Sequence, residues 1–234
     1  MAGDVDPMVP PPGRRVAVVG RLGIYPMVPL ALPARRVLAF LALHESAVPR
    51  GAAAELLWPD TPEPQGRANL RRALWQLPHG WVESVGEDLV LEAEVDLHRA
   101  QAVAGRCLEG SGATLEEIRL LSEDLLPGWH EEWATAAQAA FRQLRVQALE
   151  AACRTLAGAG QHALATQAGI AALAAEPLSE SVAEALVAAH LSQGNRYAAL
   201  RCYRDFARVL RAELGVDPAF AAPLGLSGTR TSPL

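Results

Sequence analysis

The stretch 64–77 combines a helical repeat of leucines with side chains that can recognise nucleic-acid bases. On a helical wheel Asn69, Arg72 and Gln76 share one face. The opposite face carries three leucines, Leu70, Leu74 and Leu77. Arginine can bind guanine through two hydrogen bonds or hold a phosphate, and asparagine or glutamine can pair with adenine. An ordinary amphipathic helix with a hydrated polar face shows the same pattern, so this stretch alone leaves both interpretations open.

Two further residues, Arg71 and Trp75, lie on the flank of this polar face. An indole beside an arginine can contact a nucleic-acid sugar or base, but it can equally pack at an interface between domains. Neither role of Trp75 is excluded by the sequence.

Residue patterns typical of enzymes and metal sites are missing from the sequence. It contains no P-loop, no GxSxG and no HExxH motif. The three cysteines, Cys107, Cys153 and Cys202, are odd in number and far apart, and the six histidines lack metal-ligand spacing. We therefore expect no enzymatic activity, no metal and no cofactor.

Charge is divided unevenly along the chain. Residues 13–82 hold nine arginines against four acidic residues, whereas residues 83–234 hold twelve arginines against twenty acidic residues. All 21 basic residues are arginines. A basic first third followed by an acidic remainder fits one module that meets phosphate and another that does not, although chance segregation of solvated charges would look the same.

The elements around the 64–77 helix follow from periodicity and from glycine and proline positions. Short strands are expected at 14–23, 24–28 and 30–32, helices at 35–44, 49–58 and 64–77, and a hairpin from 81–85 and 89–91. Strands, three short helices and a hairpin are the element order of a winged helix with an amino-terminal sheet.

Everything after Asp96 has a helical pattern. Thr114 and Glu117 match a capping box, and further helices are expected to end near Gly158 and to cover 161–175, 180–193 and 196–214. Gly160 and Gly194 lie 34 residues apart, the period of a tetratricopeptide (TPR) repeat. The second part of the chain is therefore predicted to be TPR-like.

Several stretches of the sequence resemble the Streptomyces antibiotic regulatory protein (SARP) family with its bacterial transcriptional activator domain (BTAD). In the first part these are Leu32–Trp58 (LPARRVLAFLALHESAVPRGAAAELLW), Ala68–Leu77 (ANLRRALWQL) and Val95–His98. In the second part they are Leu125–Trp129, Arg142–Glu150, Glu176–Ser181, Gly194-Asn195, Ala199–Tyr203 and Glu213–Pro218. The combination covers about residues 15–218 and is specific, although each piece alone is weak.

This resemblance implies an OmpR-type winged helix that binds direct repeats near promoters, usually as two protomers side by side. It also implies that the helical domain mediates self-association and contacts RNA polymerase. By position, the recognition helix is 65–77 and the wing is 81–92. The candidate DNA-binding residues are Arg71, Arg72, Gln76, Asn69, Arg67, Arg35, Arg36 and Arg50.

Three departures from the family pattern bear on DNA affinity. Pro78-His79-Gly80 shortens the recognition helix, and the segment 134–140 is less charged than in relatives. The wing holds no arginine and four acidic residues, Glu83, Glu87, Asp88 and Glu92. These acidic residues would repel phosphate.

The sequence thus predicts an α+β winged helix (OmpR-type) followed by an all-α TPR-like domain. The expected divisions are a disordered leader (1–13), a winged-helix DNA-binding domain (14–95), a TPR-like activator domain (96–218) and a flexible tail (219–234). We expect a cytoplasmic, nucleoid-associated transcriptional regulator without a membrane segment. Its partners would be double-stranded promoter DNA, RNA polymerase holoenzyme and a second protomer on DNA. The alternative is a protein-interaction adaptor with a degenerate winged helix.

Overall fold

A computed structural model of the protein describes residues 13–223. These residues form two compact units: an amino-terminal unit of residues 13–99 and 124–139, and a helical unit of residues 100–123 and 140–223. The predicted fold class, an α+β winged helix followed by a helical domain, is confirmed. Most of the predicted leader (1–12) and of the predicted tail (224–234) lies outside the described residues, and the predicted divisions at 95 and 218 stay predictions.

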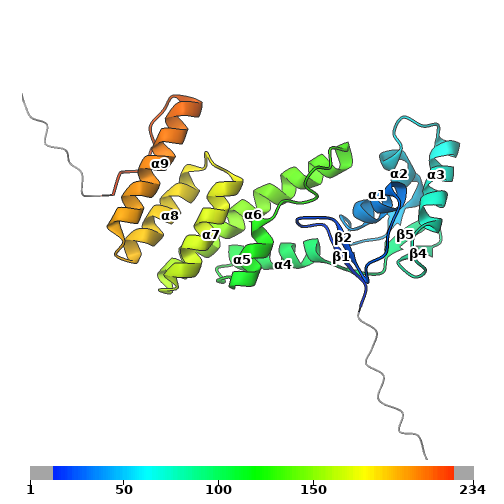
Figure 1. The fold of residues 1–234 in the computed structure, drawn as a ribbon, viewed down its shortest axis with the longest axis horizontal. Helices are drawn as coiled ribbons and strands as arrows, with labels where there is room; N and C mark the ends of the chain where they lie inside the picture. The colour runs from blue at the N-terminus through cyan, green and yellow to red at the C-terminus, as the bar shows by residue number, and fades with distance from the viewer. Residues whose placement is uncertain (1–12, 224–234) are drawn as a thin grey trace, which may run out of the picture. The chain divides into compact units, whose positions relative to one another are not determined.

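The winged helix of the amino-terminal unit comprises three helices and a three-stranded antiparallel sheet (Figure 1). The helices are α1 (Leu32–Leu41), α2 (Arg50–Leu57) and α3 (Glu63–Trp75). The sheet has the order β3-β5-β4, formed by Val48–Pro49, Asp88–Leu91 and Val82–Val85. The β4–β5 hairpin pairs Val82 with Leu91 and Val85 with Asp88, so this hairpin is the wing.

One apolar core holds the three helices on this sheet. Its members are Val37, Phe40, Leu41, Val48, Ala53, Ala54, Leu57, Leu70, Ala73 and Leu89. Leu74 and Leu77, which were predicted to share the buried face of α3 with Leu70, are only half-buried but pack against the same core. The predicted orientation of α3 is therefore confirmed, although the two leucines nearest its carboxyl end are less deeply buried than Leu70.

A second sheet, with the order β2-β1-β6, is formed by strands that precede and follow the winged helix in sequence. Strands β1 (Arg15–Ala17) and β2 (Gly23–Tyr25) are antiparallel, and β6 (Glu94–Val95) runs parallel to β1. The predicted strand 14–23 is shorter because the Asp96 carboxylate accepts hydrogen bonds from the backbone amides of Val18 and Val19, at 2.8 and 3.2 Å. Those amides are consequently not free for a strand ladder.

The predicted strand at 30–32 was wrong. Strand β2 ends at Tyr25, and α1 already begins at Leu32. Pro33 occupies the first turn of α1, where its missing amide costs nothing. Pro26 and Pro29 in the intervening loop have no N–H to donate to a sheet, so this segment does not add a strand.

Residues 124–139 complete the amino-terminal unit. The amides of Gly20 and Leu126 donate to the carbonyls of Asp124 and Val18, at 2.6 and 2.8 Å, which attaches the segment to the chain beyond β1. Trp133 then packs edge-on against Phe40 of α1, with ring centroids 5.5 Å apart. A segment far from the winged helix in sequence thus contributes to its packing.

The remaining helices follow the predicted pattern closely. They are α4 (Asp96–Leu108), α5 (Leu115–Ser122), α6 (Glu132–Gly158), α7 (His162–Ala175), α8 (Glu180–Ser192) and α9 (Arg196–Leu214). Within residues 96–218 the structure contains no strand, only a single bridge between Leu125 and Val19. Figure 1 shows α7, α8 and α9 stacked side by side in the helical unit.

The predicted 34-residue repeat is confirmed in the helical unit. Gly160 and Gly194 both adopt positive φ, 73° and 79°, at equivalent turns between α6 and α7 and between α8 and α9. Six further pairs of positions 34 residues apart are equivalent in this repeat, and four of them are buried alike: Ala165 with Ala199, Ala172 with Phe206, Leu149 with Ala183 and Cys153 with Val187. In the other two pairs Gly169 and Leu156 are buried, whereas Tyr203 and His190 are half-buried. The helical unit is therefore TPR-like.

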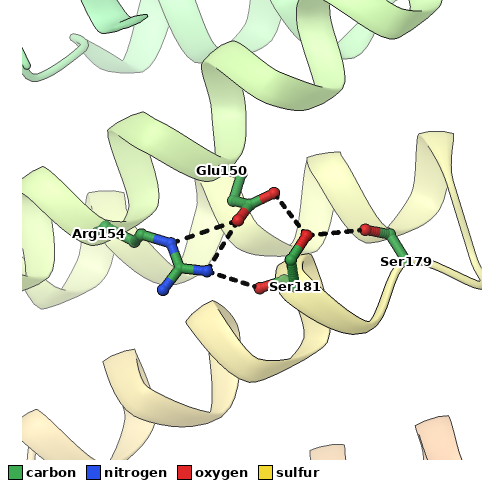
Figure 2. A network of polar contacts seen from close by, with 4 residues as sticks. All are labelled: Glu150, Arg154, Ser179 and Ser181. Atoms are coloured by element: carbon green, nitrogen blue, oxygen red, sulfur yellow. Dashed lines mark hydrogen bonds and ion pairs between the residues drawn. The ribbon is translucent and has the colours of Figure 1, made fainter. Parts of the chain in front are cut away.

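A polar network fastens the first turn of α8 to α6 (Figure 2). The Glu150 carboxylate accepts hydrogen bonds from Arg154 at 2.8 Å and from the Ser181 hydroxyl at 2.9 Å. Arg154 also donates to the Ser181 carbonyl, and the hydroxyls of Ser179 and Ser181 are 3.3 Å apart. The network joins the two successive helix pairs of the repeat.

Candidate nucleic-acid interface

One side of helix α3 packs against the rest of the winged-helix core. Gly66 is buried, and a Cβ there would lie 3.5 Å from the carbonyl oxygen of Ala54 in α2. Leu70 and Ala73 continue this buried side along the helix. Close packing on one side leaves the other side of α3 to solvent within the amino-terminal unit.

The solvent-facing side of α3 carries most of the predicted DNA-binding residues. Arg71, Arg72 and Gln76 are exposed, and Asn69 is half-buried. The Asn69 side-chain oxygen accepts hydrogen bonds from Gln65 at 3.1 Å and from Arg72 at 3.2 Å. These bonds orient an amide and a guanidinium side by side, where both retain donors for a ligand.

Arg67 lies on the same helix but forms an internal ion pair. Its Nε is 3.0 Å from Oε1 of Glu63, one turn earlier, and both side chains are well exposed. Such exposed pairs contribute about 0.3–0.5 kcal/mol and are broken easily. Arg67 is therefore available to a phosphate at little energetic cost.

Arg50 joins α2 to the wing beside α3. Its Nη2 donates to the Ser84 hydroxyl at 2.5 Å, and its amide donates to the Glu87 carbonyl at 2.9 Å. Arg50 and Arg71 line one groove of about 620 Å³ between the end of α3 and strand β4. The groove also contains His79 and the carboxylate of Glu83, so its charge is mixed.

Arg35 and Arg36 are not brought to this face. Arg36 is held inside the unit: its Nη2 donates to the Leu57 carbonyl at 2.8 Å and its Nε lies 3.2 Å from Glu131. Arg35 is exposed but lines a different groove, of about 730 Å³, with Arg21 and the loop after β2. The other six candidates lie on α3 or beside it, with Arg67 and Asn69 on opposite flanks of the helix, about 160° apart.

The wing next to α3 is acidic. Glu83, Glu87 and Glu92 are exposed and Asp88 is half-buried. Carboxylates at these positions oppose the approach of a polyanion, and the opposition weakens as salt rises. The wing therefore limits the electrostatic attraction that the arginines of α3 provide.

Trp75, which the sequence places on the flank of the polar face, was not among the candidate DNA-binding residues. Trp75, the last residue of α3, is 85% exposed. This indole directly follows Leu74, a leucine of the buried face, so the helical pattern places it away from the middle of that face. Its exposure could not be predicted because it depends on which parts of the fold reach that end of the helix.

Metal and membrane features are not found in the described part of the chain. No group of three or more histidine, cysteine or acidic side chains within residues 13–223 is arranged to hold a metal ion. None of the helices in these residues is long and apolar enough to cross a membrane.

Comparison with known proteins relates the chain to transcriptional regulators. A family model described as the bacterial transcriptional activator domain matches residues 89–222. The regulatory protein AfsR of Streptomyces coelicolor is 31% identical over 202 residues, which cover 79% of this chain and 20% of AfsR. The chain thus spans about a fifth of the length of this relative.

The fold also has a counterpart among solved structures. The structure titled Mycobacterium tuberculosis EmbR in complex with low affinity phosphopeptide superposes with a TM-score of 0.62 at 22% identity. The match covers 88% of this chain and 62% of that one. At this identity the match bears on the fold alone, and it includes most of both units.

Proposed function

Because the chain belongs to the bacterial transcriptional activator domain family, as its resemblance to SARP regulators predicted, we propose that it is a DNA-binding transcriptional activator. In this proposal α3 enters the major groove of promoter DNA. Asn69, Arg72 and Gln76 contact base edges, while Arg50, Arg67 and Arg71 contact phosphates. The protein would then act in the cytoplasm, on the nucleoid when bound.

The observation that carries this proposal is the exposed polar side of α3. It brings three arginines and two side-chain amides together on a helix whose other side is fixed in a winged-helix core. Arg36 has a structural role in this proposal, and Arg35 belongs to a separate surface.

The small number of arginines on α3 limits how tightly one protomer would bind DNA. Each phosphate neutralised by an arginine releases counterions, so affinity falls with salt in proportion to the number of phosphate contacts. A single α3 with an acidic wing beside it neutralises only a few phosphates. We therefore propose that tight binding requires two protomers on direct repeats, with RNA polymerase holoenzyme contacted through the helical unit.

The test is a titration of the protein on DNA at two salt concentrations. Fragments selected from genomic DNA supply a specific site, and a scrambled site measures sequence-independent binding. The Arg72→Ala variant should lose about 1–3 kcal/mol of discrimination between the two sites, whereas Arg71→Ala should weaken both alike. Arg204→Ala, which removes an exposed arginine from the helical unit, is the matched control.

The second candidate function is a protein-interaction adaptor, and the acidic wing is the observation that favours it. In that case the winged helix no longer binds DNA and the TPR-like unit holds a protein partner. An absence of DNA binding at low salt, with enough protein for two protomers to bind, would establish this alternative over the activator.

A further inference from the structure

The position of Trp75 on α3 is unusual for a large apolar side chain. Its indole is 85% exposed, and it follows Arg71 by four residues and Arg72 by three. At about 100° per residue, Trp75 projects between the two arginines, about 40° from Arg71 and about 60° from Arg72. A large apolar surface thus stands in the middle of the face that carries the cationic groups.

The chemistry of this position restricts what can cover it. An indole offers one N–H donor and no acceptor, and the rest of its surface is apolar. The flanking arginines favour an anionic partner. One carboxylate of the wing, Glu83, lines the same groove as Trp75, whereas the acidic residue of α3, Glu63, lies at the opposite end of the helix. The occupant must therefore present an apolar group within a strongly negative surface.

Duplex DNA has one such group on its base edges, the C5-methyl of thymine in the major groove. Resting on the proposed function, in which α3 enters that groove, we propose that Trp75 is a specificity-determining residue that contacts a thymine methyl next to the base bound by Arg72. Arg71 and Arg50 line the groove beside Trp75 and hold the flanking phosphates. Trp75 thereby adds apolar recognition to a face that otherwise offers only hydrogen bonds.

The experiment selects binding sites from random DNA with the wild type and with Trp75→Ala. Each thymine of the wild-type site is then replaced in turn by deoxyuridine, which removes only the methyl. At one position this replacement should weaken wild-type binding about fourfold, as expected for one buried methyl. The same replacement should leave the affinity of Trp75→Ala unchanged, and its selected sites should lose the preference for thymine there.

Two further variants keep this test decisive. Trp75→Phe retains an aromatic surface and should keep the thymine preference. Tyr197→Ala removes an aromatic residue that is 76% exposed in the helical unit and should change nothing. Circular dichroism checks that each variant is folded.

The outcomes separate this inference from the proposed function. The inference is overturned if deoxyuridine has no effect at any position while Arg72→Ala still loses discrimination. It is also overturned if Trp75→Ala weakens all sequences alike, which indicates a sugar contact, or if it impairs activation with unchanged DNA binding, which indicates a protein contact. A wild type that selects no sequence overturns both proposals.

Discussion

The Nε atom of Arg36 in α1 lies 3.2 Å from Oε1 of Glu131, just before α6, with side chains 22% and 31% exposed. The same guanidinium donates to the carbonyl oxygen of Leu57, at the end of α2, and lies 6.0 Å from the ring centroid of Trp58. Arg36 therefore links α1, α2 and the segment 124–139 within the amino-terminal unit.

Loss of this link should affect stability and leave DNA recognition intact. Arg36→Ala leaves the Leu57 carbonyl without its side-chain donor and Glu131 without its cation, so the free energy of unfolding should fall by about 1–3 kcal/mol. Glu131→Gln keeps the shape of the side chain and should cost less, about 1 kcal/mol. Urea denaturation followed by circular dichroism measures both, with the exposed neighbour Arg35→Ala as control. Equal stability of Arg36→Ala and Arg35→Ala would contradict a structural role for Arg36.

Neutralising the wing should strengthen DNA binding. Glu83 and Glu87 are exposed on the hairpin beside α3, so Glu83→Gln combined with Glu87→Gln removes two repulsive charges. Affinity should rise several-fold at low salt for specific and scrambled DNA alike, and the gain should shrink as salt screens the charges. Glu109→Gln with Glu213→Gln removes the same charge from exposed positions in the helical unit. A gain equal to that of this control would show that net charge, and not the wing, limits binding.

Local sequence patterns predicted the elements and the repeat because these depend on nearby residues. Leucine spacing in 64–77 identified the buried side of α3, and the 34-residue glycine spacing identified the turns at Gly160 and Gly194. Most helix ends shifted by a residue or two, and α1 (Leu32–Leu41) begins and ends three residues before the predicted 35–44. Helix α3 stops at Trp75 with Gln76 as its carboxy-terminal cap, two residues before the predicted end.

Long-range contacts were beyond local patterns. Adjacent arginines such as Arg35 and Arg36 look alike in sequence, yet only Arg36 is held internally, because Glu131 and the Leu57 carbonyl reach it from distant parts of the chain. The placement of residues 124–139 on the amino-terminal unit depends on the same kind of contact, through Phe40 and Trp133. The exposure of Trp75 likewise depends on whether residues distant in the sequence reach the carboxyl end of α3.

The capping box at the start of α5 should make stability depend on pH. The Thr114 hydroxyl accepts from the Glu117 amide, and the Glu117 carboxylate accepts from the Thr114 amide at 2.9 Å. Chiefly this backbone hydrogen bond, with help from Arg106, lowers the pKa of Glu117 below its ordinary value of 4.5. The charged carboxylate therefore stabilises the fold above about pH 4.5, and this contribution is lost as pH falls through the lowered pKa.

Two variants measure the capping box. Thr114→Ala should cost about 1 kcal/mol of unfolding free energy at neutral pH. Glu117→Gln should be less stable than wild type at pH 7, and the difference should vanish in acid, where wild-type Glu117 is protonated. Chemical denaturation at several pH values records both. A difference between wild type and Glu117→Gln that stays the same at every pH would show that charge on Glu117 contributes nothing.

Two helical glycines of the helical unit should respond oppositely to alanine. In α7, Gly169 faces the neighbouring helices: a Cβ there would lie 2.9 Å from Cδ1 of Leu186 and 3.0 Å from Sγ of Cys153. In α4, a Cβ at Gly105 would meet no atom within 4 Å. Alanine favours a helix by about 1 kcal/mol over glycine at either position, so the difference between the two variants isolates the cost of packing.

Gly105→Ala should therefore raise the free energy of unfolding by about 0.5–1 kcal/mol. Gly169→Ala should lower it by about 1–2 kcal/mol, because overpacking between α6, α7 and α8 exceeds the gain in helix propensity. Combining Gly169→Ala with Leu186→Val removes part of the clash, so the double variant should lose less stability than the sum of the two single losses. Thermal and urea unfolding of the four variants measure these differences. Gly169→Ala could instead stabilise the protein as much as Gly105→Ala does. In that case the close approach of α7 to α8 at Gly169 contributes nothing to the free energy of unfolding.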